Sequence, residues 1–123
     1  MTRQRLRVGE IGEEAARVYL EQLGYLIVET NYRCKLGEID IIARDGEATV
    51  IVEVRTKTDR TRGGPEESIT GKKARQLYRL ALYYLQSTCK REVPSRIDLV
   101  AVMLDKESHN VESLNHIRGI LSG

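Results

Sequence analysis

The chain has 123 residues, which is enough for one domain with its own core and leaves no room for a second, so we predict a single domain over residues 1–123. Hydrophobic residues make up 41% and charged residues 31%, as in soluble globular proteins, and no apolar run suits a signal peptide or a membrane span. We therefore expect a cytoplasmic protein with no membrane partner. Phe and Trp are absent, so no aromatic platform for stacking bases is evident. Cys34 and Cys89 form no CxxC pair and are expected to be reduced thiols.

The first part of the chain predicts a basic arm, a helix and a strand. Residues 1–8 carry three arginines and no acid and are expected to be flexible. A helix is predicted from Gly9 to Leu23, because apolar residues recur at helical spacing, and Gly24 is typical of the position after a helix. Tyr25–Val28 is predicted to be a strand and Asn31–Gly37 a loop.

Two apolar runs around an Asp-Gly pair indicate a β-hairpin. Glu38–Arg44 and Glu47–Thr56 are the predicted strands, and Asp45-Gly46 between them is the strongest short signal for a two-residue turn. The next segment, Lys57–Glu67, is rich in Thr, Gly and charge and is predicted to be a turn or a mobile flap.

The second half of the chain predicts another helix and a fourth strand. Ser68 or Thr70 can cap a helix that runs to about Ser87, and Arg96–Leu104 is predicted to be a strand. The tail, His109–Gly123, is predicted to form a short strand and one helical turn. This αβββαβ order predicts an α/β fold with a mixed central sheet, whose fourth strand runs parallel to the third.

The hairpin gathers charged side chains at one end. With a turn at Asp45-Gly46, Glu38 is expected opposite Glu53, and Asp40 diagonal to Glu53. One face is then wholly apolar and must be core, whereas the other combines charges with two isoleucines, so we expect a helix on each face of the sheet. The apolar face comprises Ile39, Ile41, Ala43, Ala48, Val50, Val52 and Val54, and the charged end comprises Glu38, Asp40, Glu53 and Arg55.

Three carboxylates around one point need a partner, and two interpretations stay open. Arg55 can neutralise Glu38 or Glu53 in an ordinary cross-strand ion pair. Alternatively, the carboxylates share a divalent cation, since Mg²⁺ is typically held by one or two carboxylates and several waters. Glu13 and Lys73 border the apolar stripes of the two helices, where each can point into such a site or snorkel at the rim of the core.

Basic residues concentrate in one segment. Residues 55–79 contain eight basic and three acidic residues, although the whole chain carries a net charge of only +2. Such a segment is either a solvated surface or a contact for the nucleic-acid backbone. The candidate phosphate contacts are Lys57, Arg60, Arg62, Lys72 and Arg75. His109 and His116 have no Cys or acidic partner at ligand spacing, so no zinc site is expected.

Four segments together resemble the YraN-like proteins of bacteria. They are Gly9-x-x-Gly12-Glu13-x-x-Ala16, Asn31-Tyr32-Arg33, Gly37-Glu38-Ile39-Asp40 and Val52-Glu53-Val54-Arg55. Each segment is weak alone, whereas their order and spacing are specific, and the match spans about Gly9 to Asp105. That family is similar to the PD-(D/E)XK nuclease superfamily, which includes archaeal Holliday-junction resolvases and type II restriction enzymes. The resemblance therefore implies a restriction endonuclease-like fold.

The resemblance also implies roles for individual residues. Asp40 corresponds to the metal-binding aspartate of the superfamily, Glu53 to the acid of its (D/E)-x-K element, and Glu13 to the helix carboxylate of the resolvase-like branch. Lys73 matches a basic position in the second helix of the YraN-like pattern. Arg55 stands where the superfamily has lysine, and arginine cannot act as a base near neutral pH, although it can bind phosphate.

The predicted function is metal-dependent hydrolysis of phosphodiester bonds in structured or branched nucleic acid, with DNA preferred to RNA. Mg²⁺ or Mn²⁺ is expected on Asp40, Glu53 and Glu13, with the Val54 carbonyl as a further ligand and Arg55, Lys73 or Lys57 acting on the substrate. A homodimer is also expected, because junction-cutting enzymes act in pairs. The first alternative is a nucleic-acid-binding module that does not cut, and the second is a protein adaptor whose carboxylates only form ion pairs.

Overall fold

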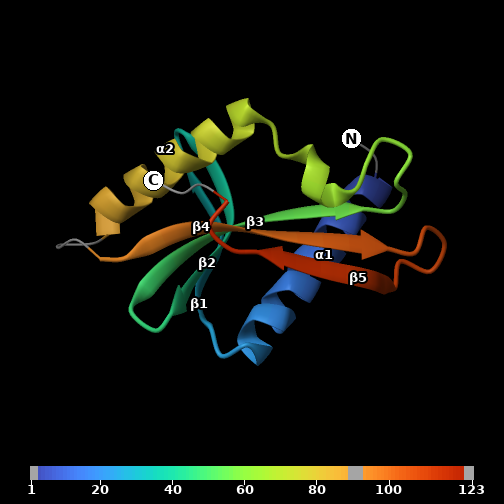
Figure 1. Ribbon diagram of the computed structural model, residues 1–123, viewed down its shortest axis with the longest axis horizontal. Coiled ribbons are helices and arrows are strands. Elements are labelled where there is room, and N and C mark those ends of the chain that lie inside the picture. Colours follow the sequence, from blue (N-terminus) through green and yellow to red (C-terminus); the bar gives the residue numbers. More distant parts are fainter. Residues whose placement is uncertain (1–2, 89–92, 121–123) are drawn as a thin grey trace.

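A five-stranded mixed sheet lies between two helices (Figure 1). The computed structural model describes residues 3–88 and 93–120, apart from the side chains of residues 3–6. The helices are α1 (Arg3–Gln22) and α2 (Gly71–Thr88), with a short 3₁₀ helix, η1 (Pro65–Ser68). The strands are β1 (Leu26–Cys34), β2 (Gly37–Asp45), β3 (Ala48–Lys57), β4 (Ser95–Leu104) and β5 (Val111–Ile117).

The sheet has the order β1-β2-β3-β4-β5, and only β3 and β4 are parallel. The predicted αβββαβ order and the mixed sheet are confirmed, with β5 added at the edge. No helix in the described part of the chain combines the length and the apolar character needed to cross a membrane. Cys34 is a free thiol on β1, whereas Cys89 lies outside the described residues.

Helix α1 begins at Arg3, so the flexible arm predicted for residues 1–8 is wrong from that residue onward. The segment before Gly9 contains no helix breaker, and Val8 packs against the core together with Ile11. This packing offsets the cost of a glycine inside a helix, about 1 kcal/mol. The predicted end of the helix is confirmed, because α1 stops at Gln22 and a glycine with a φ of 93° follows two residues later.

Strand β1 is longer than the sequence predicts. It continues to Cys34 and joins β2 through two residues, so the loop predicted over Asn31–Gly37 is wrong. The polar residues of β1 can pair with β2 through their backbone because β1 is an edge strand, so their side chains can stay in solvent. The strand accommodates a bulge after Ile27 and a left-handed residue, Asn31, whose φ is 53°.

The turn between β2 and β3 lies one residue later than predicted. Asp45 pairs with Ala48, so the turn residues are Gly46-Glu47, and the glycine has a φ of 61°, as the first central position of a type II′ turn requires. Each residue of β2 therefore pairs two positions further along β3 than predicted; Ile42, for example, faces Ile51. Since side chains alternate, a shift of two leaves the assignment of faces largely intact.

Separate apolar clusters fill the two sides of the sheet. Ile41 belongs to the cluster under α1, and Ile42 to the cluster under α2, which confirms a helix on each face. Ile39 also lies under α2, so its predicted place beside Ile41 is wrong, because the alternation of β2 breaks at Asp40. The fully buried strand residues under α1 are Ile41, Ala43, Val50, Val52, Val100, Val102 and Leu104.

The second half of the chain follows the predicted order. The backbone N–H of Lys73 donates to Thr70 Oγ1 at 3.1 Å, so Thr70 caps α2, as predicted. The segment predicted to be a turn or flap contains η1 near its end. In the tail the predicted strand is β5, but residues 109–120 contain no helical turn; residues 121–123 lie outside the described part.

Candidate functional site

The sheet splits where its acidic residues lie. Counted from the turn, the last pair between β2 and β3 is Ile41 with Val52. Strand β2, however, stays paired with β1 as far as Gly37. Asp40 and Glu53 are the next residues on the two strands, and the same register places them opposite one another. The Asp40 carboxylate accepts a hydrogen bond of 2.8 Å from the Val54 backbone N–H, which takes the place of strand pairing. The two carboxylates are therefore closer partners than the diagonal pair predicted from the sequence.

Helix α1 brings a third carboxylate to the split. Gly12 is buried, and a Cβ atom on it would clash with the side chain of Thr56, so only glycine allows the helix to pack this closely against β3. The next residue, Glu13, lines a small pocket together with Asp40, and the charge of Asp40 raises the pKa of Glu13. Asp40 and Glu53 are also close enough to shift the pKa of one another.

Two cations approach the Glu53 carboxylate. Arg55 Nε lies 3.1 Å from Glu53 Oε2, and Lys73 Nζ, from α2, lies 3.8 Å from the same oxygen. The predicted pairing of Arg55 with Glu53 is therefore present, but both residues lie on β3, so the ion pair is not cross-strand, and Lys73 shares it. Arg55 Nε is nevertheless a buried atom without a hydrogen bond, so the guanidinium is not locked onto the carboxylate.

Glu38 does not join this group as the sequence predicts. The register shift of the hairpin moves it away from its predicted position opposite Glu53, and its side chain lies 3.7 Å from Arg33 on β1. Its charge still acts on the site at longer range, because it contributes to raising the pKa of Glu13 and of Asp40.

Burial raises the pKa of all three carboxyl groups, and repulsion from a nearby carboxylate adds to each rise. The pKa of Glu13 rises from 4.5 to about 7, mainly through burial and then through the charge of Asp40. The pKa of Glu53, whose side chain is almost fully buried, also rises to about 7 for the same two reasons, against an opposing effect of Lys73. Burial raises the pKa of Asp40, although the Val54 N–H opposes the shift. Near neutral pH Glu13 and Glu53 therefore retain a share of the protons that exposed carboxylates have lost.

The donor chemistry of these residues fits a hard divalent cation. No group of three or more His, Cys, Asp or Glu side chains in the described ranges is arranged so that it could hold a metal ion. Mg²⁺, however, needs only one or two carboxylates and completes its shell with water. Asp40 and Glu53 are the pair that would hold it, with Glu13 and the Val54 carbonyl as the further ligands predicted from the sequence.

An open groove of about 840 Å³ adjoins the carboxylates. Glu13, Val54 and Arg55 line it, together with two of the predicted phosphate contacts, Lys57 and Arg62. The groove thus places one of the three carboxyl groups, Glu13, beside part of the basic segment, whereas Asp40 and Glu53 are not among its lining residues.

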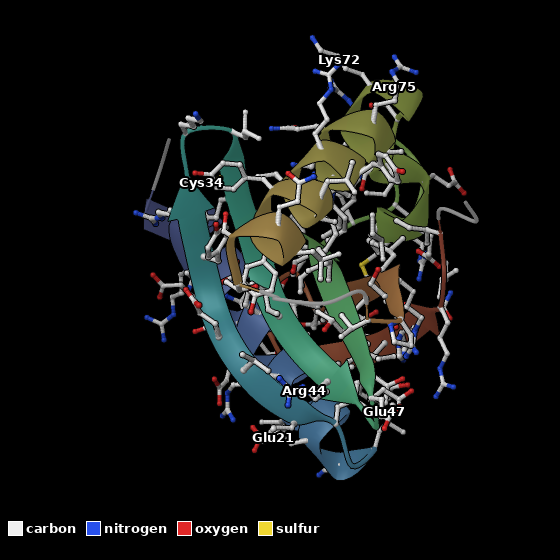
Figure 2. The ribbon with its side chains drawn as sticks, turned by 90° about the vertical axis from the view of Figure 1, so that its left-hand side faces the viewer. Glu21, Cys34, Arg44, Glu47, Lys72 and Arg75 are labelled. Atoms are coloured by element: carbon white, nitrogen blue, oxygen red, sulfur yellow. The ribbon has the colours of Figure 1, made fainter. Side chains whose placement is uncertain are left out.

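The other predicted phosphate contacts lie elsewhere. Arg60 is exposed on the same loop as Arg62 but is not among the residues that line the groove. Lys72 and Arg75 project from the first turns of α2, at the end of the molecule opposite to Arg44 (Figure 2). The basic segment therefore forms two surfaces, one in the groove and one on α2.

Sequence reasoning missed two groove residues, Lys106 and His109. Both lie in the turn between β4 and β5, far along the chain from the acidic residues. The signal that could have found them is the parallel pairing of β3 and β4, because the carboxyl ends of parallel strands meet at one edge of a sheet.

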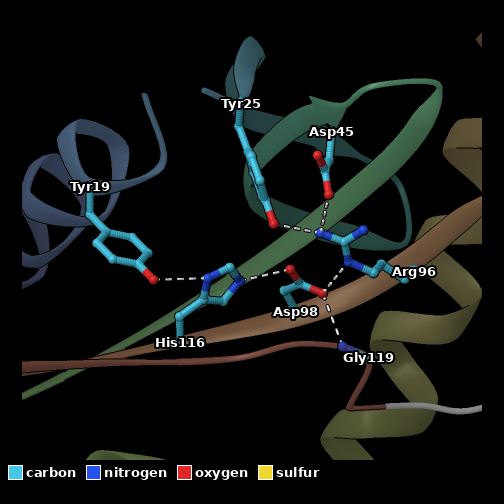
Figure 3. Close-up of polar contacts among 7 residues, drawn as sticks. All are labelled: Tyr19, Tyr25, Asp45, Arg96, Asp98, His116 and Gly119. Carbon is cyan, nitrogen blue, oxygen red and sulfur yellow. Dashed lines mark hydrogen bonds and ion pairs between the residues drawn. The ribbon is translucent and has the colours of Figure 1, made fainter. Parts of the chain in front are cut away.

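A second polar cluster, which the sequence did not reveal, surrounds Asp98 on β4 (Figure 3). Asp98 is fully buried, and its carboxylate accepts hydrogen bonds from Arg96 Nε at 3.0 Å and from the Gly119 backbone N–H at 3.0 Å. His116 Nε2 lies 2.8 Å from its other oxygen. These contacts join β5 and the tail to β4.

The cluster extends to the other elements on this side of the sheet. The ring of His116 reaches Tyr19 Oη on α1 at 3.2 Å, while Arg96 Nη2 donates to Tyr25 Oη at 2.7 Å and to Asp45 at 3.1 Å. Each charged member has a partner from the same chain, and none lines the groove. The geometry is that of an internal brace.

Comparison with known proteins places the chain among bacterial relatives of similar length. A profile of the uncharacterised protein family UPF0102 matches residues 12–102. A UPF0102 protein of Moorella thermoacetica is 49% identical over 119 residues, which cover 97% of this chain and 98% of the relative. The UPF0102 protein DSY2577 of Desulfitobacterium hafniense is 45% identical over 98% of this chain and 100% of its own, and a UPF0102 protein of Syntrophus aciditrophicus is 43% identical over 89% and 86%. The YraN-like resemblance is thereby confirmed.

Proposed function

The chain belongs to the UPF0102 family, and we propose that it is a metal-dependent nuclease that hydrolyses phosphodiester bonds in structured or branched DNA. One observation carries the proposal. Three carboxyl groups with raised pKa values lie near one another at the split of the sheet, and one of them, Glu13, lines a groove that contains several cations. The αβββαβ order with acids at such a split also supports kinship with the PD-(D/E)XK nucleases.

The site residues divide the work between cation and substrate. Asp40 and Glu53 hold Mg²⁺ or Mn²⁺, which when bound lowers the pKa of a water molecule and polarises a phosphate. Arg55, which lines the groove and has a buried Nε without a hydrogen bond, binds the phosphate oxygens and stabilises their developing charge. Lys73 keeps its ammonium beside Glu53 and supplies the only amine there, because arginine cannot exchange a proton near neutral pH.

Cleavage of labelled branched and linear DNA in the presence of Mg²⁺ or Mn²⁺ tests the proposal. We expect Asp40→Asn and Glu53→Gln each to reduce the rate by at least about 100-fold, since each removes a charge that stabilises the transition state. Arg44→Ala is the control and should cleave normally, because it removes an exposed charge on β2 that pairs with Thr49 near the start of β3, away from the acidic pair. Activity that survives both substitutions in the acidic pair contradicts the scheme.

A second candidate function is binding of nucleic acid without cleavage. The observation that favours it is the ion pair between Arg55 and Glu53, which already occupies part of the acidic site. Tight binding of branched DNA with no product in Mg²⁺ or Mn²⁺ would select this function. Failure to bind any nucleic acid at moderate salt would instead favour a protein adaptor. The homodimer stays a prediction, which sedimentation of the protein with and without branched DNA can test.

A further inference from the structure

The turn between β4 and β5, residues 105–110, contributes a wall to the groove. Because β3 and β4 are parallel and Lys57 lies opposite Met103, both strands end at the same edge of the sheet. Crevices outside the carboxyl ends of strands are the usual ligand sites of such sheets. Figure 1 shows the loop after β3, the β4–β5 turn and the start of α1 together at the right-hand end of the molecule. Lys106 and His109 of this turn line the groove.

Internal hydrogen bonds make this turn rigid. The Asp105 N–H donates to the Asn110 carbonyl at 2.8 Å, and the His109 N–H donates to the Asp105 carbonyl at 2.9 Å. The Asp105 carboxylate accepts hydrogen bonds from the backbone of Glu107 and Ser108. His109 itself has a φ of 61°, an uncommon conformation for any residue except glycine, which the surrounding contacts maintain. The side chains of Lys106 and His109 therefore stand on a fixed support.

Positive charge dominates the groove. Among the side chains that the structure describes, four permanent cations line it, against two acids, Glu13 and Asp59. The Asp59 carboxylate is engaged within its own loop, where it accepts hydrogen bonds from the backbone N–H and the hydroxyl of Thr61. These bonds lower the pKa of Asp59, and the charges of Lys106 and Lys57 contribute to the same shift. Lys106 thus faces the loop after β3 across the groove.

The size and lining of the groove fit a single strand. Its volume lies within the range of sites that enclose small ligands, roughly 300–1,000 Å³. No Phe, Trp or Tyr lines the groove, so contact with the bases by stacking is excluded and the phosphates must provide the affinity.

We propose that this groove binds one nucleic-acid strand next to the carboxylates, with Lys106 and His109 contacting phosphates from one wall and Lys57 and Arg62 from the other. The inference rests on the proposed function for its ligand class and adds a single-stranded segment to the substrate. Structured DNA supplies such a segment wherever a strand leaves a duplex. Binding through phosphates alone is weak and strongly dependent on salt.

Fluorescence anisotropy of a short labelled poly-dT strand, measured in EDTA over a series of salt concentrations, tests the inference. We expect Lys106→Ala to weaken binding by about 3- to 10-fold at low salt and to reduce the slope of log K against log salt by about 0.7, the value for one phosphate contact on a single strand. His109→Gly suits the left-handed backbone and should weaken binding by a smaller factor. Arg44→Ala is the matched loss of a charge, on β2 at the hairpin end away from the groove, and should leave the affinity and the salt slope unchanged.

The outcomes separate this inference from the nuclease proposal, because no metal is present. Lys106→Ala with wild-type affinity and salt slope, and with an unchanged melting temperature, overturns the groove as the binding site. A loss of duplex binding as large as the loss of single-strand binding overturns the preference for one strand. Reduced binding by Lys106→Ala in a protein that never cleaves supports the groove and rejects only the nuclease.

Discussion

Two clusters of buried carboxylates in this protein differ in how their charges are satisfied. Asp98 accepts hydrogen bonds from Arg96 and Gly119 and lies 2.8 Å from His116, all within the chain. At the split of the sheet, by contrast, Asp40 and Glu13 have no ion-pair partner among the described residues, and their contacts include one another. Each cluster therefore contains a buried carboxylate, Asp98 in one and Glu53 in the other, and the clusters differ in whether the chain supplies partners for all of their acids.

The comparison indicates which cluster awaits an external partner. A buried charge is tolerated where the fold supplies its partners, and such a group then acts as a brace. A set of acids whose pKa values are raised by burial and by one another lowers the stability of the fold, and such sets are typical of functional sites. The following predictions test this difference, from the largest expected effect to the smallest.

Removal of the brace should cause the largest loss of stability. Asp98→Ala leaves His116 without its carboxylate partner and removes one acceptor from Arg96, which keeps Asp45 and Tyr25. We expect the free energy of unfolding to fall by about 3–5 kcal/mol. Asp40→Asn, in the metal-free protein, should be neutral or stabilising because it removes a repelled charge. Urea unfolding of both variants measures the contrast, and equal losses in the two would remove the distinction between the clusters.

The approach of α1 to β3 should be the next most sensitive feature. Gly12→Ala places a methyl group against Thr56, and we expect it to cost about 1–3 kcal/mol and to displace Glu13 from Asp40. Gly9→Ala is the matched control, since a Cβ there meets nothing within 4 Å and should stabilise the helix by up to about 1 kcal/mol. Urea unfolding and nuclease assays compare the two; equal behaviour would show that close packing at Gly12 is dispensable.

The acidic site should make the metal-free protein less stable as pH rises. The raised pKa of Glu53 means that the folded protein holds a proton on this carboxyl group more tightly than the unfolded chain does. The free energy of unfolding should therefore fall between pH 4.5 and about 7. Glu53→Gln should remove part of this fall and, above pH 7, stabilise the protein by about 1–2 kcal/mol, after allowance for its lost pairing with Arg55 and Lys73. Thermal unfolding across pH measures it, with the exposed Glu47→Gln as control. A parallel pH profile for wild type and Glu53→Gln would refute the assignment.

Cation binding should produce the smallest effect. Mg²⁺ or Mn²⁺ at about ten times its Kd should stabilise the protein by about 1.4 kcal/mol, which raises the Tm by about 3–6 °C above pH 7. Below pH 4.5 the carboxyl groups are protonated and the increase should vanish. Asp40→Asn should abolish it, whereas Asn115→Ala, on the exposed edge strand β5, should not. An equal increase in Asp40→Asn would place the cation elsewhere.

The sequence predicted the order of the elements and the members of the acidic site because those depend on local patterns. Apolar periodicity identifies α1 and α2, and the Asp-Gly pair identifies the hairpin. The exact register was wrong, since a glycine can occupy either central position of a two-residue turn. In the observed register Glu38 lies outside the site and Asp40 lies opposite Glu53. The approach of Glu13 depends on the close packing at Gly12, which no local pattern reveals.

Other parts of the site depend on contacts between distant segments. The brace around Asp98 joins six elements or connecting segments of the chain, and its members carry no common sequence motif. Lys106 reaches the groove only because β4 runs parallel to β3. The extended β1 shows the opposite case, in which a polar segment with loop-like composition pairs as an edge strand.

The parallel pairing of β3 with β4 also has a consequence for how the chain folds. The hairpin and α1 can assemble while the polypeptide is still being synthesised, but one side of β3 has no partner until residues 95–104 leave the ribosome. The incoming strand has eight consecutive buried residues, Ile97–Leu104, a composition prone to aggregation when it is unpaired. Closure of the long connection through α2 is slow compared with hairpin formation. Chains that end before β4 should therefore accumulate as insoluble material, and the rate of strand insertion should limit the yield of native protein.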